Sequence, residues 1–138
     1  NDMFFSSKDN LIMPERGINM GDGWETKRRR EPGNDWVILE LGQKGKIDQL
    51  EIDTAHFKGN FPESCSVEAI DLGNTKRPEL GKLNDASWQT LLERSTLQAD
   101  HQHYFSKELK DVGPVTHLRL QIYPDGGISR LRAFGTRV

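Results

Sequence analysis

The residues best suited to acid–base chemistry lie together in residues 53–62, which read DTAHFKGNFP. His56 could move protons between a substrate and water, because an imidazole gains and loses a proton near neutral pH. Asp53 stands three residues earlier and could fix the imidazole tautomer. Loops that leave a rigid strand are common places for functional sites. A non-catalytic interpretation stays open, in which Asp53 caps a turn and His56 packs beside Phe57.

A second polar cluster, residues 22–30, contains four consecutive cations, Lys27, Arg28, Arg29 and Arg30. An arginine in such a loop could hold a carboxylate through two parallel N–H groups. A solvated surface loop is the plain alternative, since charge runs usually lie in water. Nucleic-acid binding is disfavoured, because 19 Lys and Arg residues are outnumbered by 21 Asp and Glu residues and the net charge is −2.

The remaining histidines and the cysteine give no strong signal for a metal or a nucleophile. His101 and His103 would share one face of a strand, but a catalytic zinc site usually needs three protein ligands, and no third stands at a recognisable spacing. We therefore expect no metal. Cys65 is the single cysteine and has no cation beside it in the sequence, so we expect an inert thiol. A chain that cannot form an internal disulfide is typical of a reducing compartment, which predicts a cytoplasmic protein.

These clusters must be positioned by strands, because the apolar residues of the chain alternate with a period of two. In residues 116–123, the side chains of Thr116, Leu118, Leu120 and Ile122 share one face of a half-buried strand. The same reasoning predicts further short strands in residues 36–41, 50–54, 67–70, 88–92 and 128–134.

Turns and irregular segments complete the expected fold. Gly and Pro clusters predict turns at residues 42–45, 71–74 and 124–127. The nearly continuous apolar run 36–41 is typical of a strand covered on both faces. We therefore expect an all-β fold, an antiparallel sandwich or jelly roll. Residues 1–20 are irregular and are expected to wrap the sandwich, with Leu11 and Ile12 as anchors.

Length and composition fit one soluble domain. The chain has 138 residues, of which 34% are hydrophobic and 29% are charged, which is enough for one core and short for two. No apolar run approaches the roughly 18 residues of a membrane-spanning helix, and no charged-then-apolar leader opens the sequence. We therefore expect no membrane partner. The chain starts at Asn1 rather than Met, which suggests a piece of a longer protein.

Three sequence blocks follow one another along the chain: residues 20–30 with 34–36 (MGDGWETKRRR, then NDW), residues 52–62 (IDTAHFKGNFP) and residues 123–135 (YPDGGISRLRAFG). Together they resemble the signature of the allantoicase family and cover most of the chain. The resemblance implies a jelly-roll β-sandwich of the galactose-binding or discoidin-like kind. It also implies that residues 1–138 are one of two similar repeats, and the wording of the blocks resembles the second repeat.

The resemblance further implies hydrolysis of allantoate to ureidoglycolate and urea, a step of purine catabolism, without a cofactor. Such a reaction needs a cation for the substrate carboxylate, an acid for the departing urea nitrogen and a base for water. Carried over by motif, the candidates are Arg28 or Arg29 for the carboxylate, His56 as acid or base, Asp53 or Glu25 to orient it, Lys58 and Asn60 for the ureido carbonyls, and Arg130 as a further anion-binding residue.

As partners, the resemblance implies allantoate, a second jelly-roll repeat and further copies in a homo-oligomer. Two other interpretations stay open. One is a non-catalytic discoidin-like module that binds a ligand through loops at one end, and the other is a structural repeat that supports a partner repeat. The basic cluster in residues 22–30 favours the enzyme, because a generic carbohydrate-binding module has no reason to carry it.

Overall fold

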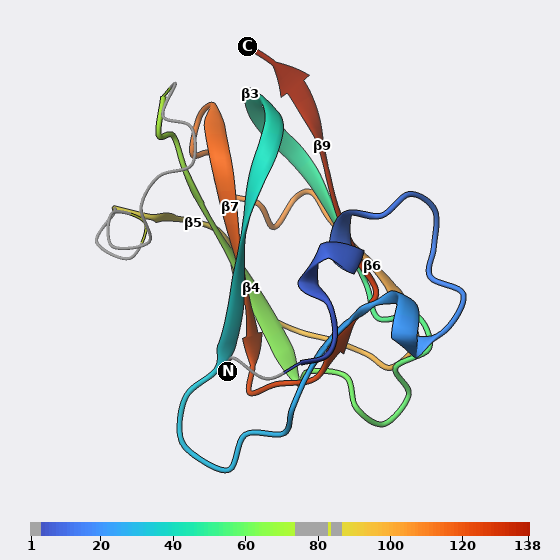
Figure 1. The fold of residues 1–138 in the computed structure, drawn as a ribbon. Coiled ribbons are helices and arrows are strands. Elements are labelled where there is room, and N and C mark those ends of the chain that lie inside the picture. The colour runs from blue at the N-terminus through green and yellow to red at the C-terminus, as the bar shows by residue number, and fades with distance from the viewer. Residues whose placement is uncertain (1–3, 74–82, 84–86) are drawn as a thin grey trace.

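Strands dominate the fold, which confirms the predicted all-β sandwich (Figure 1). The computed structural model describes residues 4–73, 83 and 87–138. Its strands are β1 (Phe4–Ser6), β2 (Trp24–Thr26), β3 (Asp35–Asp53), β4 (Ser64–Ile70), β5 (Gln89–Thr96), β6 (Gln102–Phe105), β7 (Val115–Tyr123), β8 (Gly127–Ile128) and β9 (Arg130–Arg137). One sheet has the order β1-β2-β8, and the larger one has the order β5-β4-β7-β3-β6, with β9 also paired to β3.

The longest strand, β3, takes part in both halves of the larger sheet. Up to Glu40 it pairs antiparallel with β7, and from Gly45 to Asp53 it pairs with β9. Between these two parts the register shifts, and Figure 1 shows the strand folding over at this bend. We predicted two strands separated by a turn at residues 42–45, and this prediction is wrong. A β-bulge bends a strand and disrupts its hydrogen-bond ladder only locally, so β3 can change direction here and continue as one strand.

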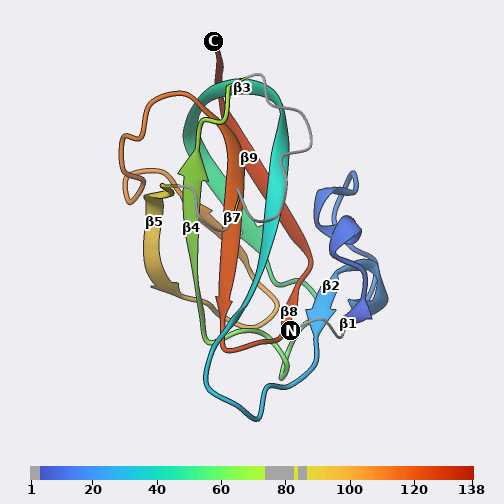
Figure 2. The same cartoon turned by 60° about the vertical axis from the view of Figure 1, so that its left-hand side comes forward.

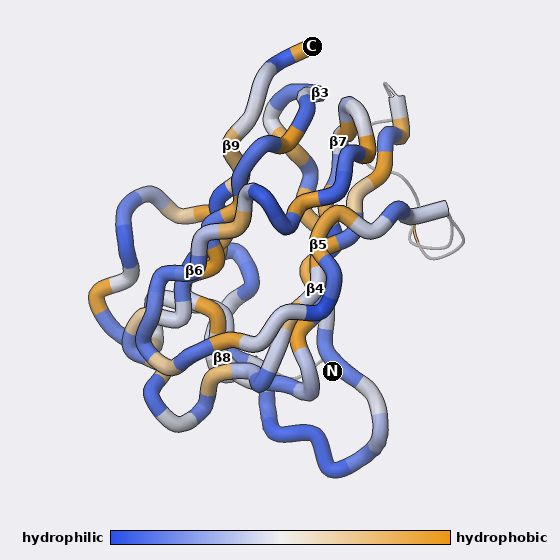
Figure 3. Tube along the Cα trace, turned by 180° about the vertical axis from the view of Figure 1, so that it is seen from behind, coloured by the Kyte–Doolittle hydropathy of each residue, from blue (hydrophilic) through white to orange (hydrophobic). Residues whose placement is uncertain are grey.

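The core lies between the strand layers. On β7, Leu118, Leu120 and Ile122 are buried, as the period-two pattern predicts. Register places Val37 of β3 and Val67 of β4 on either side of Leu120. Figure 3 shows apolar segments alternating with polar ones along these strands. Removing these apolar side chains from water is the main force that holds the sandwich together.

Two burial predictions are wrong. The run 36–41 is not covered on both faces, because Val37 points into the core while Trp36, on the opposite face, is 43% exposed. Leu11 is fully buried, as predicted, but its neighbour Ile12 is 66% exposed. Successive residues of a short 3-10 helix point in different directions, so only one residue of this pair reaches the core.

The irregular N-terminal part forms a strap, which we define as residues 7–23, between β1 and β2. It contains two 3-10 helices, η1 (Lys8–Ile12) and η2 (Met20–Asp22). Figure 2 shows the strap at the side of the sandwich, with β1 and β2 at its lower end. In the part of the chain that the structure describes, no helix is long and apolar enough to cross a membrane.

Two arginines of β9 hold the strap through its backbone. Arg130 is 2% exposed and donates to the Glu15 carbonyl at 2.9 Å, and it also donates to the carbonyl and the carboxylate of Asp22. Arg132 donates to the carbonyls of Met13 and Glu15. Charge-assisted hydrogen bonds of this kind are stronger than neutral ones. The strap is therefore fixed by cationic side chains of the neighbouring strand.

His103 on β6 is held as a neutral imidazole. Its Nδ1 lies 2.9 Å from the Ile52 carbonyl oxygen, and its Nε2 accepts the Gln98 N–H at 2.8 Å. A carbonyl oxygen can only accept, so Nδ1 carries the proton and Nε2 holds the lone pair. Burial lowers the pKa of His103 below its ordinary value, because a charged ring would lose solvation.

A glycine allows the loop after β3 to pack on β8. Phe57 of this loop is fully buried, and a Cβ added at Gly127 would lie 2.1 Å from its ring. The Gly127 N–H donates to the Asn60 carbonyl at 2.9 Å, which ties the same loop down at a second point. The loop therefore depends on the missing side chain at residue 127.

We expect Gly127→Ala to lower the free energy of unfolding by about 3 kcal/mol, because the new methyl group overpacks the Phe57 ring. Gly59→Ala is the matched control in the same loop, since a Cβ there meets nothing within 4 Å. It should leave stability unchanged or raise it by up to about 1 kcal/mol. Urea denaturation measures both effects. Equal losses in the two variants would contradict the packing assigned to Gly127.

The free energy of unfolding should fall as the pH falls from the ordinary histidine pKa of about 6.5 through the lowered pKa of native His103. In this window the unfolded chain takes up a proton that the native ring resists, so acid favours unfolding. We expect His103→Gln to flatten this dependence in denaturation series between about pH 7.5 and about pH 5. Part of the slope should remain, because burial also lowers the pKa of His117. Parallel curves for wild type and variant would show that His103 does not carry the effect.

Candidate functional site

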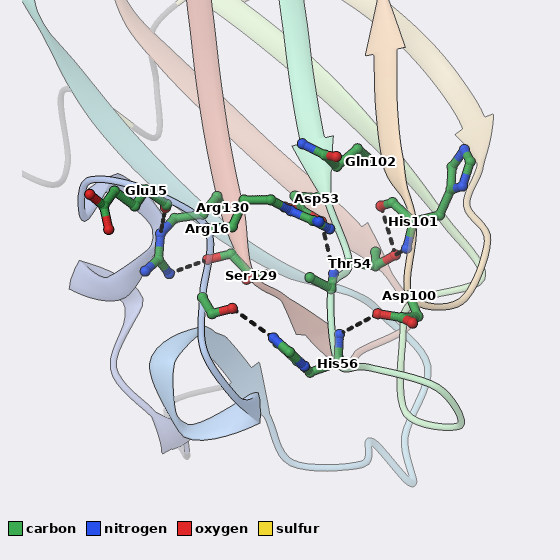
Figure 4. Close-up of polar contacts among 12 residues, drawn as sticks. Glu15, Arg16, Asp53, Thr54, His56, Asp100, His101, Gln102, Ser129 and Arg130 are labelled. Atoms are coloured by element: carbon green, nitrogen blue, oxygen red, sulfur yellow. Dashed lines mark hydrogen bonds and ion pairs between the residues drawn. The ribbon is translucent and has the colours of Figure 1, made fainter.

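The candidate site lies where β3 ends (Figure 4). Asp53 is the last residue of β3, and its side chain is fully buried. Its carboxylate binds Arg16 of the strap through two bonds, Nε to Oδ2 at 2.9 Å and Nη2 to Oδ1 at 3.2 Å. Oδ1 also accepts the Ala55 N–H at 2.9 Å. The hydrogen bond to Asp53 raises the pKa of Arg16 above its ordinary value, so the guanidinium stays charged and compensates the buried carboxylate.

His56 adopts a left-handed backbone conformation, with φ of 74°. Its ring Nε2 lies 2.6 Å from the carbonyl oxygen of Gly17 in the strap. Because a carbonyl only accepts, Nε2 carries the proton, and in the neutral ring Nδ1 holds the lone pair. A non-glycine residue at positive φ stores strain, and such residues cluster at functional sites. The strap therefore sets which ring nitrogen of His56 can accept a proton.

Asp100 supports His56 from the other side. Its Oδ1 accepts the His56 backbone N–H at 2.8 Å, and its own N–H donates to the Phe57 carbonyl at 3.1 Å. The hydrogen bond from the His56 backbone holds the pKa of Asp100 below its ordinary value. Asp100 also has a positive φ, 47°. The strained backbone at His56 is thus stabilised by an ionised carboxylate.

The strap can pack closely against Ser129 because residue 17 is glycine. A Cβ at Gly17 would lie 2.7 Å from the Oγ of Ser129. Ser129 is fully buried, and within the described residues its hydroxyl has no hydrogen-bond partner. The Ser129 N–H donates to the Asp53 carbonyl at 2.6 Å, so the strap, the end of β3 and Ser129 form one cluster.

Glu25 and Asn60 form a second polar pair of the site region. The Asn60 amide donates to the Glu25 carboxylate at 2.6 Å and lies 3.7 Å from the Met20 sulfur. Lys58, on the same loop as Asn60, is exposed. The structure therefore pairs Glu25 with Asn60, while the imidazole of His56 bonds to the strap.

The predicted arginines occupy different environments. Arg29 donates to Asp35 at 2.8 Å, and Asp35 is 1% exposed. The Arg29 backbone N–H also donates to Asp125 at 2.7 Å. Arg130 holds the strap, as described above, whereas Arg28 is exposed on the loop after β2. The guanidinium groups of Arg29 and Arg130 thus make contacts that stabilise the fold.

Sequence reasoning missed Arg16, Gly17 and Asp100. Arg16 lies 37 residues before Asp53 in a segment without periodic pattern, so nothing local connects the two. The only sequence signal is a charged pair followed by a glycine, residues 15–17, inside an otherwise irregular stretch.

The histidine pair and the cysteine lie in environments that their neighbours define. Both ring nitrogens of His103 are used by Ile52 and Gln98, and the His101 ring packs edge-on against it with centroids 4.8 Å apart. Among the described residues, no three His, Cys, Asp or Glu side chains are grouped to hold a metal ion. Burial raises the pKa of the Cys65 thiol to about 12, so the reactive thiolate is suppressed.

Solved structures share this architecture. The allantoicase of Saccharomyces cerevisiae superposes with a TM-score of 0.83 at 38% identity, over 99% of this chain and 38% of that chain. A family 32 carbohydrate-binding module of C. perfringens, solved in complex with galactose, superposes with a TM-score of 0.64 at 12% identity, over 93% of this chain and 84% of that one. The second likeness shows the fold alone. Both confirm the galactose-binding-like jelly roll.

Relatives in sequence lead to the same family. A protein of Ralstonia nicotianae named as a probable allantoicase is 54% identical over 135 residues, which are 98% of this chain and 40% of that protein. The chain thus spans about 40% of the length of the curated relatives it matches. The family model described as the allantoicase repeat matches residues 1–138. The chain therefore belongs to the allantoicase family and carries its repeat.

Proposed function

We propose that this chain is a catalytic repeat of an allantoicase and takes part in hydrolysing allantoate to ureidoglycolate and urea. Membership of the family supports the reaction. The observation that carries the site is the half-exposed Arg16, held by the buried Asp53 within a strap that also bonds to His56. The guanidinium of Arg16 and the imidazole of His56 are thus both tied to this part of the strap.

Arg16 is the residue we propose to bind the substrate carboxylate. Asp53 occupies its Nε and Nη2 groups, so Nη1 remains to donate to a substrate. Its side chain is 53% exposed, which leaves room for a ligand. Arg28 stays in the proposal as the second candidate because it is exposed. Arg29 and Arg130 are proposed to act by holding the loop after β2 and the strap.

His56 is proposed as the acid–base residue. Its Nδ1 lone pair would take a proton from the water that attacks the central carbon of allantoate, and the imidazolium would return a proton to the departing ureido nitrogen. Water thus supplies the hydroxyl of ureidoglycolate, and the leaving group departs as urea. Lys58 and Asn60 are proposed to donate to the ureido carbonyls, with Glu25 positioning Asn60 through their 2.6 Å hydrogen bond.

The whole protein is proposed to contain a second jelly-roll repeat and to act in the cytoplasm as a homo-oligomer. The longer relatives support the second repeat, because about 60% of the Ralstonia nicotianae protein lies outside the match. We propose that this chain corresponds to the second repeat of such a protein. A buried, unreactive cysteine fits a reducing compartment.

We expect His56→Gln to reduce kcat for urea release by at least about 100-fold, because loss of an acid–base residue typically costs that much. The assay uses a chimera in which this chain replaces the 135 matching residues of the Ralstonia nicotianae relative. Arg30→Gln, at an exposed position, is the control and should retain full activity. If a folded His56→Gln chimera keeps near-normal turnover, the repeat supports the other repeat and is not itself catalytic.

Arg16→Lys should raise KM for allantoate about tenfold with a smaller effect on kcat, because lysine keeps the charge opposite Asp53 but lacks the guanidinium fork. Arg28→Lys is the matched substitution and should change KM less than about twofold. Steady-state urea release by the chimera gives both constants. The reverse order of effects would assign the substrate carboxylate to Arg28.

A further inference from the structure

Exposed apolar side chains are concentrated on the strap. Among the described residues, eight large apolar side chains are exposed, and half of them fall within residues 12–20. Scattered exposed apolar residues are ordinary on a protein surface, whereas a concentration marks an interaction site. We call these four side chains the apolar ridge: Ile12 (66% exposed), Met13 (47%), Ile18 (79%) and Met20 (46%).

The apolar ridge is fixed in place by the body of the sandwich. Arg132 donates to the backbone carbonyl of Met13, and His56 bonds to that of Gly17, next to Ile18. Within the strap itself, the Gly23 N–H donates to the Met20 carbonyl at 3.1 Å. A surface that is already ordered loses little conformational entropy when a partner binds. Binding of a partner to the apolar ridge would therefore cost little conformational entropy on this side of the interface.

We propose that the second repeat of the longer protein covers the apolar ridge. This inference rests on the two-repeat organisation proposed above and does not depend on the reaction. The 135 matching residues are 40% of the Ralstonia nicotianae relative, so about 200 of its residues lie outside the match, enough for another domain of this size. A tethered repeat meets the ridge at an effective concentration of about millimolar, which a separate copy rarely reaches.

Covering the ridge would also enclose the site. Ile18 follows directly after Arg16 and Gly17, and Met20 lies 3.7 Å from the amide nitrogen of Asn60. Arg16 is 53% exposed in the single repeat, so water reaches its guanidinium. A contact on the ridge would exclude part of this water and strengthen the hold of Arg16 on an anion.

Methionine oxidation tests the contact, because Met13 and Met20 are natural reporters within the ridge. Peroxide is added to the isolated chain and to the chimera, and mass spectrometry follows the sulfoxide at each position. We expect both methionines to oxidise more slowly in the chimera by roughly an order of magnitude. Ile18→Ser should remove most of this protection, whereas Phe134→Ser, at a 47% exposed residue on β9, should leave it intact.

Equal oxidation rates in the two proteins would overturn the proposal. Protection that appears in the isolated chain and rises with its concentration would also overturn it, because the occupant would then be a second copy. Urea release is measured on the same samples. A chimera that releases urea with unprotected methionines counts against the ridge contact alone, whereas protected methionines without urea release support the contact and count against the proposed reaction.

Discussion

The buried carboxylate of Asp53 is the constraint on which the site depends. Asp53 is fully buried at the end of β3, where an unpaired carboxylate would destabilise the fold by several kcal/mol. The compensating charge comes from Arg16, which the chain supplies from the strap. The docked strap therefore supplies the charge that neutralises Asp53. Any change that loosens the strap also leaves a buried charge unpaired, so the position of Arg16 is determined by the stability of the fold.

The strap is a second consequence of the same principle. Its backbone carbonyls need donors, and Arg130, Arg132 and His56 provide them. These side chains extend from β9 and from the loop after β3. The strap is therefore held by separate side-chain hydrogen bonds and not by continuous backbone pairing with a strand. Four of its apolar side chains, Ile12, Met13, Ile18 and Met20, stay exposed to solvent. This explains how an irregular segment can present Arg16 in a defined geometry.

Much of the fold could be predicted from the sequence, whereas the contacts of the site could not. The alternation of apolar residues on β7 identified its core-facing side chains, because successive side chains of a strand point to opposite faces of the sheet. No such rule links Arg16, in the irregular strap, to Asp53, 37 residues later at the end of β3. Residue type also misleads: Arg29 was a candidate for binding substrate, yet it pairs with the buried Asp35. A buried acid selects its cation by three-dimensional proximity, which composition and spacing do not encode.

The strap joins two surfaces that would otherwise be independent. Its inner side carries Arg16 and the Gly17 carbonyl, which define the charge and the tautomer of the site. Its outer side carries the apolar ridge, including Ile18, which directly follows Gly17. Only Gly17 separates Arg16 from Ile18 along the chain. A partner on the ridge would therefore bear directly on the site geometry, and a repeat without its partner would keep the right residues in a more hydrated setting, where ionic contacts are weaker.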